Sequence, residues 1–322
     1  MKQVNAFIVL FGWLVSCTSL ASDAQQITRD TVKVGIYITS IHDIDFRQKE
    51  FAVTFWLWLK YRNKDFEFSQ YLEVPQAKSV DKSFYTVDSS GGRIRMLMRL
   101  QCVMKDSWRI NNFPFDRQTL RIGIENSQFD NRYLIFEPDT VGNNFDKRFT
   151  LRGWSIDSCL MSAGTKVYET AFGDESYAKP RMEFSTFRTR LVITRDGTGL
   201  FWKMFLGMYL AFLISYTCFH IHTDSIDSRF GLSVGSLFAV IGNKYIVDSS
   251  LPESTTFTLV DTLHGLTLFF ILCVVGCTAY SLKLVKNGHE AKAQKFDLIA
   301  RRVIFVAYVL LNIWFITQAK NA

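Results

Sequence analysis

Long apolar runs in the C-terminal third set the strongest limit on how this chain can fold. Met204–Ile221, Phe257–Leu282 and Val303–Ile316 are mostly aliphatic or aromatic. Runs of this kind cross a bilayer as helices, because a helix satisfies its own backbone hydrogen bonds where water is absent. The third run is slightly short unless its helix tilts or extends. A membrane protein is therefore expected, with a water-exposed part before Gly199.

A further segment between the first two runs, Ser228–Pro252, is long enough to span but contains several glycines, Asn243 and Lys244. A lipid-facing helix avoids such groups, whereas a helix shielded by others and lining a water path tolerates them. We expect Lys244 to pair with Asp248 or Asp261 rather than to select ions. The predicted spans are residues 200–221, 229–249, 257–282 and 302–319.

The net charge of +7 raises the alternative of a nucleic-acid partner. Much of the excess lies between the last two predicted spans, in a tract that we interpret as a cytoplasmic loop, residues 283–301. Four spans then leave the N-terminal domain and the C-terminus outside. We therefore expect no nucleic acid as a partner. The basic residues of the tract and its edge are Lys283, Lys286, Lys292, Lys295, Arg301 and Arg302.

The N-terminus is typical of an export signal. Lys2 precedes the apolar run Val4–Val15, and Ser19–Ala21 resembles a cleavage site. We predict a signal peptide over residues 1–22. A lipoprotein box that would place a lipid on Cys17 is the alternative.

Residues 23–198 have the pattern of an all-β domain. In Arg93–Val103 apolar and polar side chains alternate, which is the period of a half-buried strand. Many short strands separated by turns favour an antiparallel sandwich. A disulfide between Cys102 and Cys159 stays open, since the sequence does not fix their distance. The other predicted strands are Val32–Ile38, Phe51–Tyr61, Thr119–Ile124 and Arg181–Ile193.

Three landmarks, in this order and spacing, resemble the bacterial branch of the pentameric ligand-gated ion channels. The first is FPFDRQ, Phe113–Gln118, which is similar to the signature loop of the Cys-loop receptors. The cysteines that close this loop in animal members are replaced by Asp106 and Leu120. The second is ITRDG, Ile193–Gly197, and the third runs from Arg229 to Asp261. The first span lacks the proline that is usual in the family.

The resemblance implies a homopentamer, each subunit carrying an immunoglobulin-like β-sandwich followed by four transmembrane helices. It also implies that the FPFD loop presses on the linker after the second span, beside the loop Ile41–Gln48, and that Arg195 pairs with Asp116 or Asp45. The simpler alternative is a capped turn with packed rings. The expected coupling residues are Asp45, Phe113, Pro114, Phe115, Asp116, Arg195 and Pro252.

A helix turns about 100° per residue, so the second span can present one face to a pore. An Asp227 ring would attract cations, or Asp227 would cap the helix. Phe238 and Tyr245 would form narrow gate rings, or pack between helices. The glycines would keep the face small, or allow close helix contact. The face contains Asp227, Gly231, Val234, Gly235, Phe238, Ile241, Gly242, Tyr245 and Ser249.

The resemblance implies a ligand site between sandwiches, under a hairpin loop at Tyr168–Arg181. Its aromatic residues could cage an amine by cation–π contact, or they could pack locally. Protons or another small molecule are the alternative agonists. The candidate ligand-binding residues are Glu125, Phe129, Tyr168, Phe172 and Tyr177.

The expected function is that of a cation-selective, ligand-gated channel in the inner membrane, with its sandwich in the periplasm and monovalent cations as the permeant species. A non-conducting receptor or scaffold with the same fold is the alternative. No catalytic triad, metal motif or phosphate-binding loop is recognisable, so we expect no enzyme activity, no cofactor and no metal.

Overall fold

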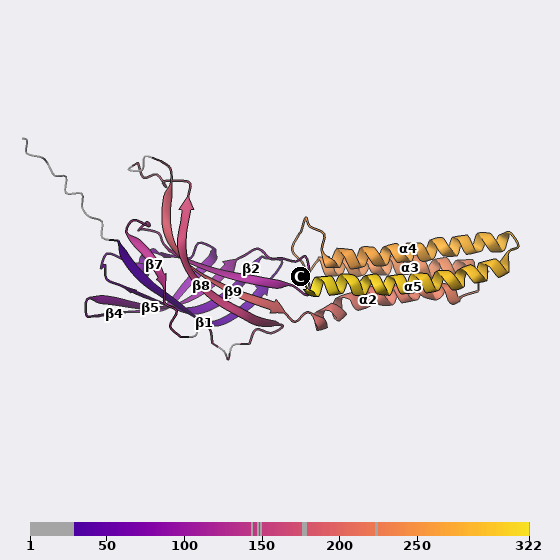
Figure 1. The fold of residues 1–322 in the computed structure, drawn as a ribbon, viewed down its shortest axis with the longest axis horizontal. Coiled ribbons are helices and arrows are strands. Elements are labelled where there is room, and N and C mark those ends of the chain that lie inside the picture. Colours follow the sequence, from indigo (N-terminus) through magenta and orange to yellow (C-terminus); the bar gives the residue numbers. More distant parts are fainter. Residues whose placement is uncertain are drawn as a thin grey trace, which may run out of the picture.

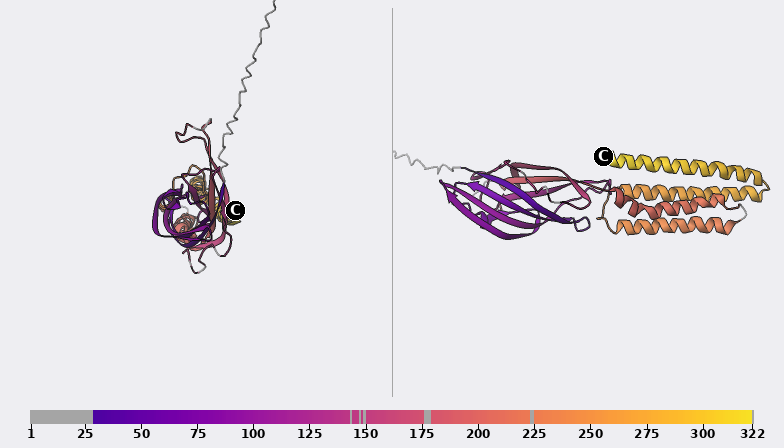
Figure 2. Two further views of the ribbon diagram at one scale, coloured as in Figure 1. Left: turned by 90° about the vertical axis from the view of Figure 1, so that its left-hand side faces the viewer. Right: turned by 90° about the horizontal axis from the view of Figure 1, so that it is seen from below.

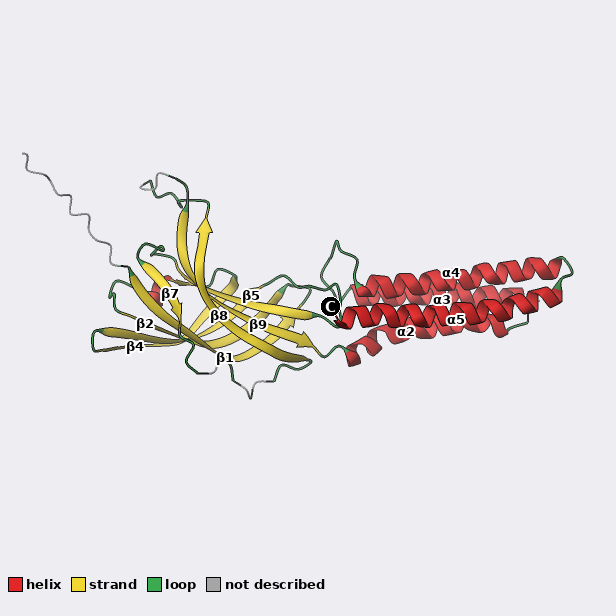
Figure 3. Cartoon of the chain, viewed as in Figure 1, coloured by secondary structure: helices red, strands yellow, loops and turns green. Residues whose placement is uncertain are grey.

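The computed structural model describes residues 29–142, 144–146, 148, 150–175, 179–222 and 225–321. The chain is elongated, with all its long strands at one end and four long helices at the other (Figure 1, Figure 3). This arrangement confirms the predicted fold class, a β-sandwich followed by four helices that are long and apolar enough to cross a membrane. The signal peptide predicted over 1–22, including Cys17, lies outside the described residues.

Two sheets form the sandwich. The five-stranded sheet has the order β4-β5-β2-β1-β7, and the four-stranded sheet has the order β3-β6-β9-β8. Among the strands that the structure describes, β7 pairs in parallel with β1 and the other pairings are antiparallel. The strands are β1 (Asp30–Asp45), β2 (Glu50–Tyr61), β3 (Leu72–Glu73), β4 (Ala77–Ser90), β5 (Arg93–Lys105), β6 (Arg117–Asn126), β7 (Leu134–Pro138), β8 (Trp154–Tyr168) and β9 (Met182–Arg195). A four-residue helix, α1 (Phe68–Tyr71), precedes β3.

The core lies between the sheets and explains why the apolar strands could be recognised. On β2, Phe51, Val53 and Phe55 are fully buried, and Leu57 and Leu59 continue the same alternation. All five predicted strands are present, within β1, β2, β5, β6 and β9. Alternation of this kind fixes both the burial and the register of a strand.

Two long strands escaped the sequence analysis because they contribute little to the core. β4 is exposed along nearly its whole length, and β8 is at most half-buried. Both are edge strands of their sheets. An edge strand is held by backbone hydrogen bonds to one neighbour, so its side chains need no apolar alternation.

The helical bundle begins directly after β9. Thr258 caps α4, accepting a hydrogen bond from the backbone N–H of Asp261, while the Asp261 carboxylate bonds the Thr258 N–H in return. Such a reciprocal cap fixes where a helix starts. The helices are α2 (Thr198–Tyr216), continued by the 3₁₀ turn η1 (Thr217–His220), α3 (Ile226–Asp248), α4 (Leu259–Lys286) and α5 (Glu290–Asn321).

Residues 283–301, which were predicted to form a cytoplasmic loop, are mostly helical, so this prediction is wrong. α4 continues to Lys286 and α5 already begins at Glu290. Within the basic tract Ala293, Asp297 and Ala300 are buried, at helical spacing. The basic residues of the tract therefore lie toward the outer face of an amphipathic helix. The high charge of the tract concealed this helical spacing in the sequence.

The helices are arranged so that α3 packs against α2 and α4, while α5 packs mainly on α4. The right-hand view of Figure 2 shows α5, in yellow, along one side of the bundle. Cys102 and Cys159 carry free thiols, with Cys102 buried on β5, and burial raises the pKa of its thiol to about 12. The question of a disulfide between them is thereby answered in this structure.

Candidate functional site

Arg195, the last residue of β9, lies where the sandwich meets the helices. Its Nε donates to Oδ1 of Asp116 at 2.7 Å, and its Nη2 donates to Oδ2 at 3.3 Å. The two side chains are only 12% and 2% exposed. The rings of Trp154, Phe46 and Phe113 surround the guanidinium at 4.0, 4.5 and 4.9 Å from their centroids. The forked pair is thus shielded from water and backed by cation–π contacts.

Asp116 is held from a second side as well. Gln118 Nε2 donates to its Oδ2 at 2.6 Å, and the backbone N–H of Arg195 donates to its carbonyl oxygen at 3.1 Å. Of the two partners expected for Arg195, the structure uses Asp116. Asp45 instead accepts the backbone N–H of Gln48 at 2.8 Å and so caps its own turn.

The loop between β5 and β6, residues 106–116, is here called the junction loop. Phe115 stacks on Phe201 near the start of α2, with centroids 5.5 Å apart. Gly197 packs so tightly on the carbonyl of Pro114 that a side chain there would collide with it. The carbonyl of Asn111 accepts the backbone N–H of the first residue of α4 at 2.7 Å. The junction loop is therefore in direct contact with two helices.

The linker between α3 and α4 was the expected target of this loop. The hydroxyl of Thr256 donates to Asn111 Oδ1 at 3.4 Å. Ser250 and Leu251 line a cavity of about 690 Å³ together with residues of the junction loop and the β1–β2 turn. Pro252 is buried. Loop and linker meet at one edge and face each other across a cavity elsewhere, and the coupling role itself stays a prediction.

The nine residues that helical periodicity assigns to a pore are all exposed in the single chain. The side chains of Phe238 and Tyr245 are 66% and 77% exposed. α3 therefore turns this face away from α2 and α4. The opposite face is buried and contains Arg229, Ser233, Ser236, Val240 and Val247.

The single chain bears on two of the alternatives for this face. Asp227 lies in the first turn of α3, while the N-cap position belongs to Ser225, so Asp227 is not the cap. A Cβ atom added at Gly231, Gly235 or Gly242 would meet no atom within 4 Å. Within this chain, then, these glycines serve no helix contact.

Lys244 pairs with both of its expected partners. Its Nζ lies 2.6 Å from Oδ2 of Asp248 and 2.7 Å from Oδ1 of Asp261, which joins α3 to α4. One turn further along α4, His264 Nε2 lies 3.0 Å from Asn243 Oδ1. Polar contacts thus lock the two helices together near the sandwich, as a structural role for Lys244 requires.

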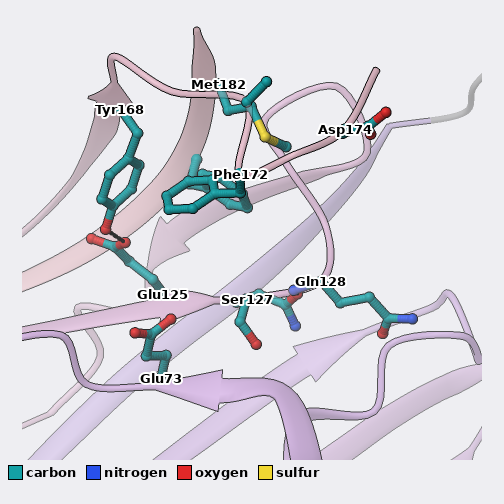
Figure 4. A pocket seen from close by; sticks show the side chains of 11 residues that line it. Glu73, Glu125, Ser127, Gln128, Tyr168, Phe172, Asp174 and Met182 are labelled. Carbon is teal, nitrogen blue, oxygen red and sulfur yellow. Dashed lines mark hydrogen bonds between the residues drawn. The ribbon is translucent and has the colours of Figure 1, made fainter. Parts of the chain in front are cut away.

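A cavity of about 460 Å³ opens beneath the hairpin of β8 and β9 (Figure 4). Tyr168, Phe172 and Glu125, three of the five candidate ligand residues, line it. Phe129 does not line this cavity, because its ring packs on Phe66 with centroids 4.9 Å apart. Tyr177 lies outside the described residues.

The floor of this cavity is a buried carboxylate. The hydroxyl of Tyr168 donates to Oε2 of Glu125 at 2.7 Å, and Figure 4 shows the two side chains pointing toward each other. Lys166 Nζ lies 3.5 Å from Oε1 of Glu125 and 4.5 Å from the centroid of the Tyr168 ring. Burial raises the pKa of the Tyr168 phenol, so that it remains a proton donor to Glu125.

Further lining residues could not be found from the sequence. Glu73 comes from β3, Asp174 from the hairpin loop and Phe184 from β9, so only the fold brings them together. The place of Lys166 next to Tyr168 could have been predicted from the sequence, because residues two apart on a strand share a face and Tyr168 was already a candidate. The cavity is lined by three carboxylates, those of Glu73, Glu125 and Asp174, while Lys166 pairs with Glu125 from outside the lining, so the cavity favours a cationic ligand.

Asp106 and Arg121 join the two ends of the junction loop region, near the positions that cysteines occupy in animal receptors. Arg121 Nη1 donates to Oδ1 of Asp106 at 2.6 Å, and the backbone N–H of Ser107 donates to the same oxygen at 2.8 Å. Burial nevertheless raises the pKa of Asp106, with Ser107 and Arg121 opposing that shift. An ion pair between Asp106 and Arg121 thus lies beside Asp106 and Leu120, the two positions at which animal members of the resembled family carry cysteines.

Comparison with known proteins agrees with these observations. No family model matches the chain. A proton-gated ion channel from Gloeobacter violaceus is 24% identical over 308 residues, which cover 88% of this chain and 81% of that protein. A match over 88% of the chain confirms the resemblance that the three landmarks indicate.

The enclosure of Arg195 leads to a first prediction. Arg195→Ala leaves the Asp116 carboxylate buried without its cation, which costs about 3–5 kcal/mol. Arg195→Lys keeps the charge but loses the fork and the ring stacking. We expect both variants to lower the melting temperature of the detergent-purified protein, the alanine variant more. Arg190→Ala, an exposed change on the same strand, is the control; an equal loss there would contradict the local role of Arg195.

Asp106 leads to a prediction about pH. Its raised pKa means that the folded protein takes up this proton more readily than the unfolded chain. The stability contributed by this group is therefore present at low pH and is lost as the pH rises through the raised pKa. In the pH range that begins near the ordinary pKa of an aspartate, about 4, and extends upward to the raised pKa of Asp106, we expect Asp106→Asn to remove that component of the pH dependence of the melting temperature.

The control for this measurement is Asp139→Asn. The hydrogen bond from Lys60 lowers the pKa of Asp139, so its contribution has the opposite sign and is lost as the pH falls. If the two variants change the pH profile in the same direction, the assignment to Asp106 fails.

Proposed function

We propose that this chain, a homologue of the bacterial pentameric ligand-gated ion channels, assembles as a homopentamer around a cation-selective pore. The four spans lie in the inner membrane and the sandwich lies in the periplasm. The basic residues at the far end of the bundle support this orientation, because cytoplasmic ends of membrane proteins are enriched in Lys and Arg.

One observation carries the proposal. In the part of the chain that the structure describes, the face of α3 that periodicity selects is exposed at all nine positions, although it contains an aspartate and three glycines. Lipid is a poor environment for that face, since a charged side chain in hydrocarbon costs several kcal/mol. Neighbouring copies of α3 around a water-filled axis provide a suitable one.

Selectivity and gating follow from the order of residues along that face. Five Asp227 carboxylates at the cytoplasmic mouth concentrate cations and repel anions. Phe238 is the large apolar side chain between Gly235 and Gly242, so its ring forms the constriction that closes by dewetting. Tyr245 forms a second narrow ring nearer the sandwich.

The agonist is proposed to act on the periplasmic sandwich, and two chemistries have support. The cavity around Glu125 and Tyr168 suits a small amine, because carboxylates and rings surround it. Protons are the second candidate, since the homologue in Gloeobacter violaceus is proton-gated and Asp106 has a raised pKa.

Either signal has a physical route to the helices. β9 runs from the hairpin beside the ligand cavity to Arg195, and its last residues lead directly into α2. The junction loop links Arg195 and Asp116 to the starts of α2 and α4. Movement of β9 or of the junction loop would therefore shift the helices that flank α3.

The pore assignment is tested by Phe238→Ala in cells, with currents recorded across a salt gradient and no agonist added. Removing the apolar ring lowers the cost of wetting the constriction, so we expect a standing leak that reverses near the cation equilibrium potential. Asp227→Asn in the same background should move the reversal potential toward zero.

Ile246→Ala is the matched control. Ile246 is 68% exposed, comparable to Phe238, but lies about 80° away around the helix. An anion-selective leak would overturn the role of Asp227. Absence of current with the protein at the cell surface would favour a non-conducting receptor with this fold.

The ligand cavity is tested by Glu125→Gln and Tyr168→Phe. If an amine is the agonist, loss of the carboxylate charge should weaken activation by at least about tenfold, one charge-assisted contact being worth about 1.5–3 kcal/mol. The Tyr168→Phe variant should have a smaller effect. Concentration–response curves for a panel of primary amines, beside a pH series, check this; an unchanged amine response would exclude the cavity, and a response to acid alone would favour protons.

A further inference from the structure

A cavity at the far end of the bundle is not explained by the pore or by the agonist. It has a volume of about 360 Å³ and lies where η1, the start of α3 and the first turns of α5 meet. Its polar lining consists of His220, His222, Arg229, Gln294, Asp297 and Arg301. The apolar part of the wall comes from the end of η1 and the outer face of α5.

Arg229 is fixed at the back of this cavity, with its side chain only 1% exposed. Its Nε and Nη2 donate to the carbonyl of Ile221 at 3.0 and 2.8 Å, and Nη2 also donates to Oδ2 of Asp297 at 2.7 Å. These bonds leave two buried atoms without a partner, Nη1 of Arg229 and Oδ1 of Asp297. A buried donor or acceptor without a partner costs about 1–3 kcal/mol, and one unused donor and one unused acceptor belong to residues that line this cavity.

The charged side chains around the cavity indicate which chemical groups can bind in it. Arg229 and Asp297 neutralise each other, and Arg301, one turn further along α5, adds an unbalanced positive charge. His220 and His222 lie on the same side and are exposed. The ligand must therefore carry an anionic acceptor for the arginines and, next to it, a hydrogen-bond donor for Oδ1 of Asp297.

The position of the cavity relative to the membrane indicates where that ligand comes from. On α5 the exposed Leu298 and Ile299 stand beside Arg301 and Arg302, and the apolar run begins at Val303. A helix that changes from basic to apolar at one level marks the boundary between lipid headgroups and hydrocarbon. Arg301 is therefore at the height of the headgroup phosphates of the cytoplasmic leaflet.

We propose that this cavity binds the headgroup of a phospholipid whose phosphate contacts Arg229 and Arg301 and whose donor group, an ammonium or hydroxyl, contacts Asp297. Phosphatidylethanolamine and phosphatidylglycerol have this combination of groups. Phosphatidylcholine has the same phosphate but no N–H or O–H donor in its headgroup. The bound lipid would hold the α2–α3 connection against α5, at the base of the proposed pore.

The experiment measures lipid binding to the purified full-length protein in detergent by native mass spectrometry. Phosphatidylethanolamine, phosphatidylglycerol and phosphatidylcholine with identical acyl chains are titrated in turn, and inorganic phosphate is added as a competitor. Arg301→Gln is the test variant, because Arg301 lines the cavity without a structural ion pair among the described contacts. Arg302→Gln is the matched control, since Arg302 is exposed beside it but does not line the cavity.

We expect both donor-bearing lipids to bind at least about fivefold more tightly than phosphatidylcholine, and Arg301→Gln, unlike Arg302→Gln, to weaken their binding about tenfold. Asp297→Asn should remove the preference over phosphatidylcholine. Competition by millimolar inorganic phosphate without any lipid preference would assign the site to free phosphate and overturn the lipid. Equal binding of all three lipids, or equal effects of the two arginine changes, would overturn the proposal.

Discussion

The contact between Arg195 and Asp116 is the point on which the two halves of the molecule depend. A guanidinium and a carboxylate are removed from water together, and three aromatic rings and Gln118 close the site. Such a pair adds little net stability when formed but is costly to break. Because Arg195 ends β9 and α2 begins three residues later, this cost holds the base of the sandwich in one geometry relative to the helices.

The rest of the junction is arranged around that fixed point. The junction loop contacts α2 through Phe115 and α4 through Asn111, while the cavity beside Leu251 leaves the α3–α4 linker room to move. Lys244 ties the end of α3 to α4 just below. A rigid contact next to an unfilled space is the arrangement expected where movement in one domain must shift another without separating them.

The polar side chains of the helical bundle differ in whether they find hydrogen-bonding or ionic partners within the chain. Lys244 and His264 find partners inside the chain, and Arg229 with Asp297 does so only in part. The carboxylate of Asp227 has no partner among the residues that the structure describes, and its side of α3 is exposed. In a membrane such groups need water, protein or lipid headgroups as partners. That requirement is the common basis for proposing an assembly around α3 and a lipid headgroup at Arg229.

The amino-acid sequence alone determined the elements whose burial imposes a period. The β2 alternation, the apolar spans and the exposed α3 face from Asp227 to Ser249 were all recognisable, because side-chain direction repeats every two residues in a strand and every 3.6 in a helix. Phe129 packs on Phe66 and does not line the cavity of Tyr168. α5 begins at Glu290, ahead of the predicted start at residue 302, because the basic tract follows helical spacing that its charge density conceals.

Only the tertiary structure decided which distant residues meet. It selected Asp116 over Asp45 for Arg195, brought Glu73 and Phe184 to the cavity of Tyr168, and joined Arg229 to Asp297 across 68 residues. No local pattern encodes such pairs, since each depends on sheet order and helix packing. Edge strands such as β4 were hidden for a related reason: backbone hydrogen bonds to a neighbour hold them, and side-chain sequence records those bonds only weakly.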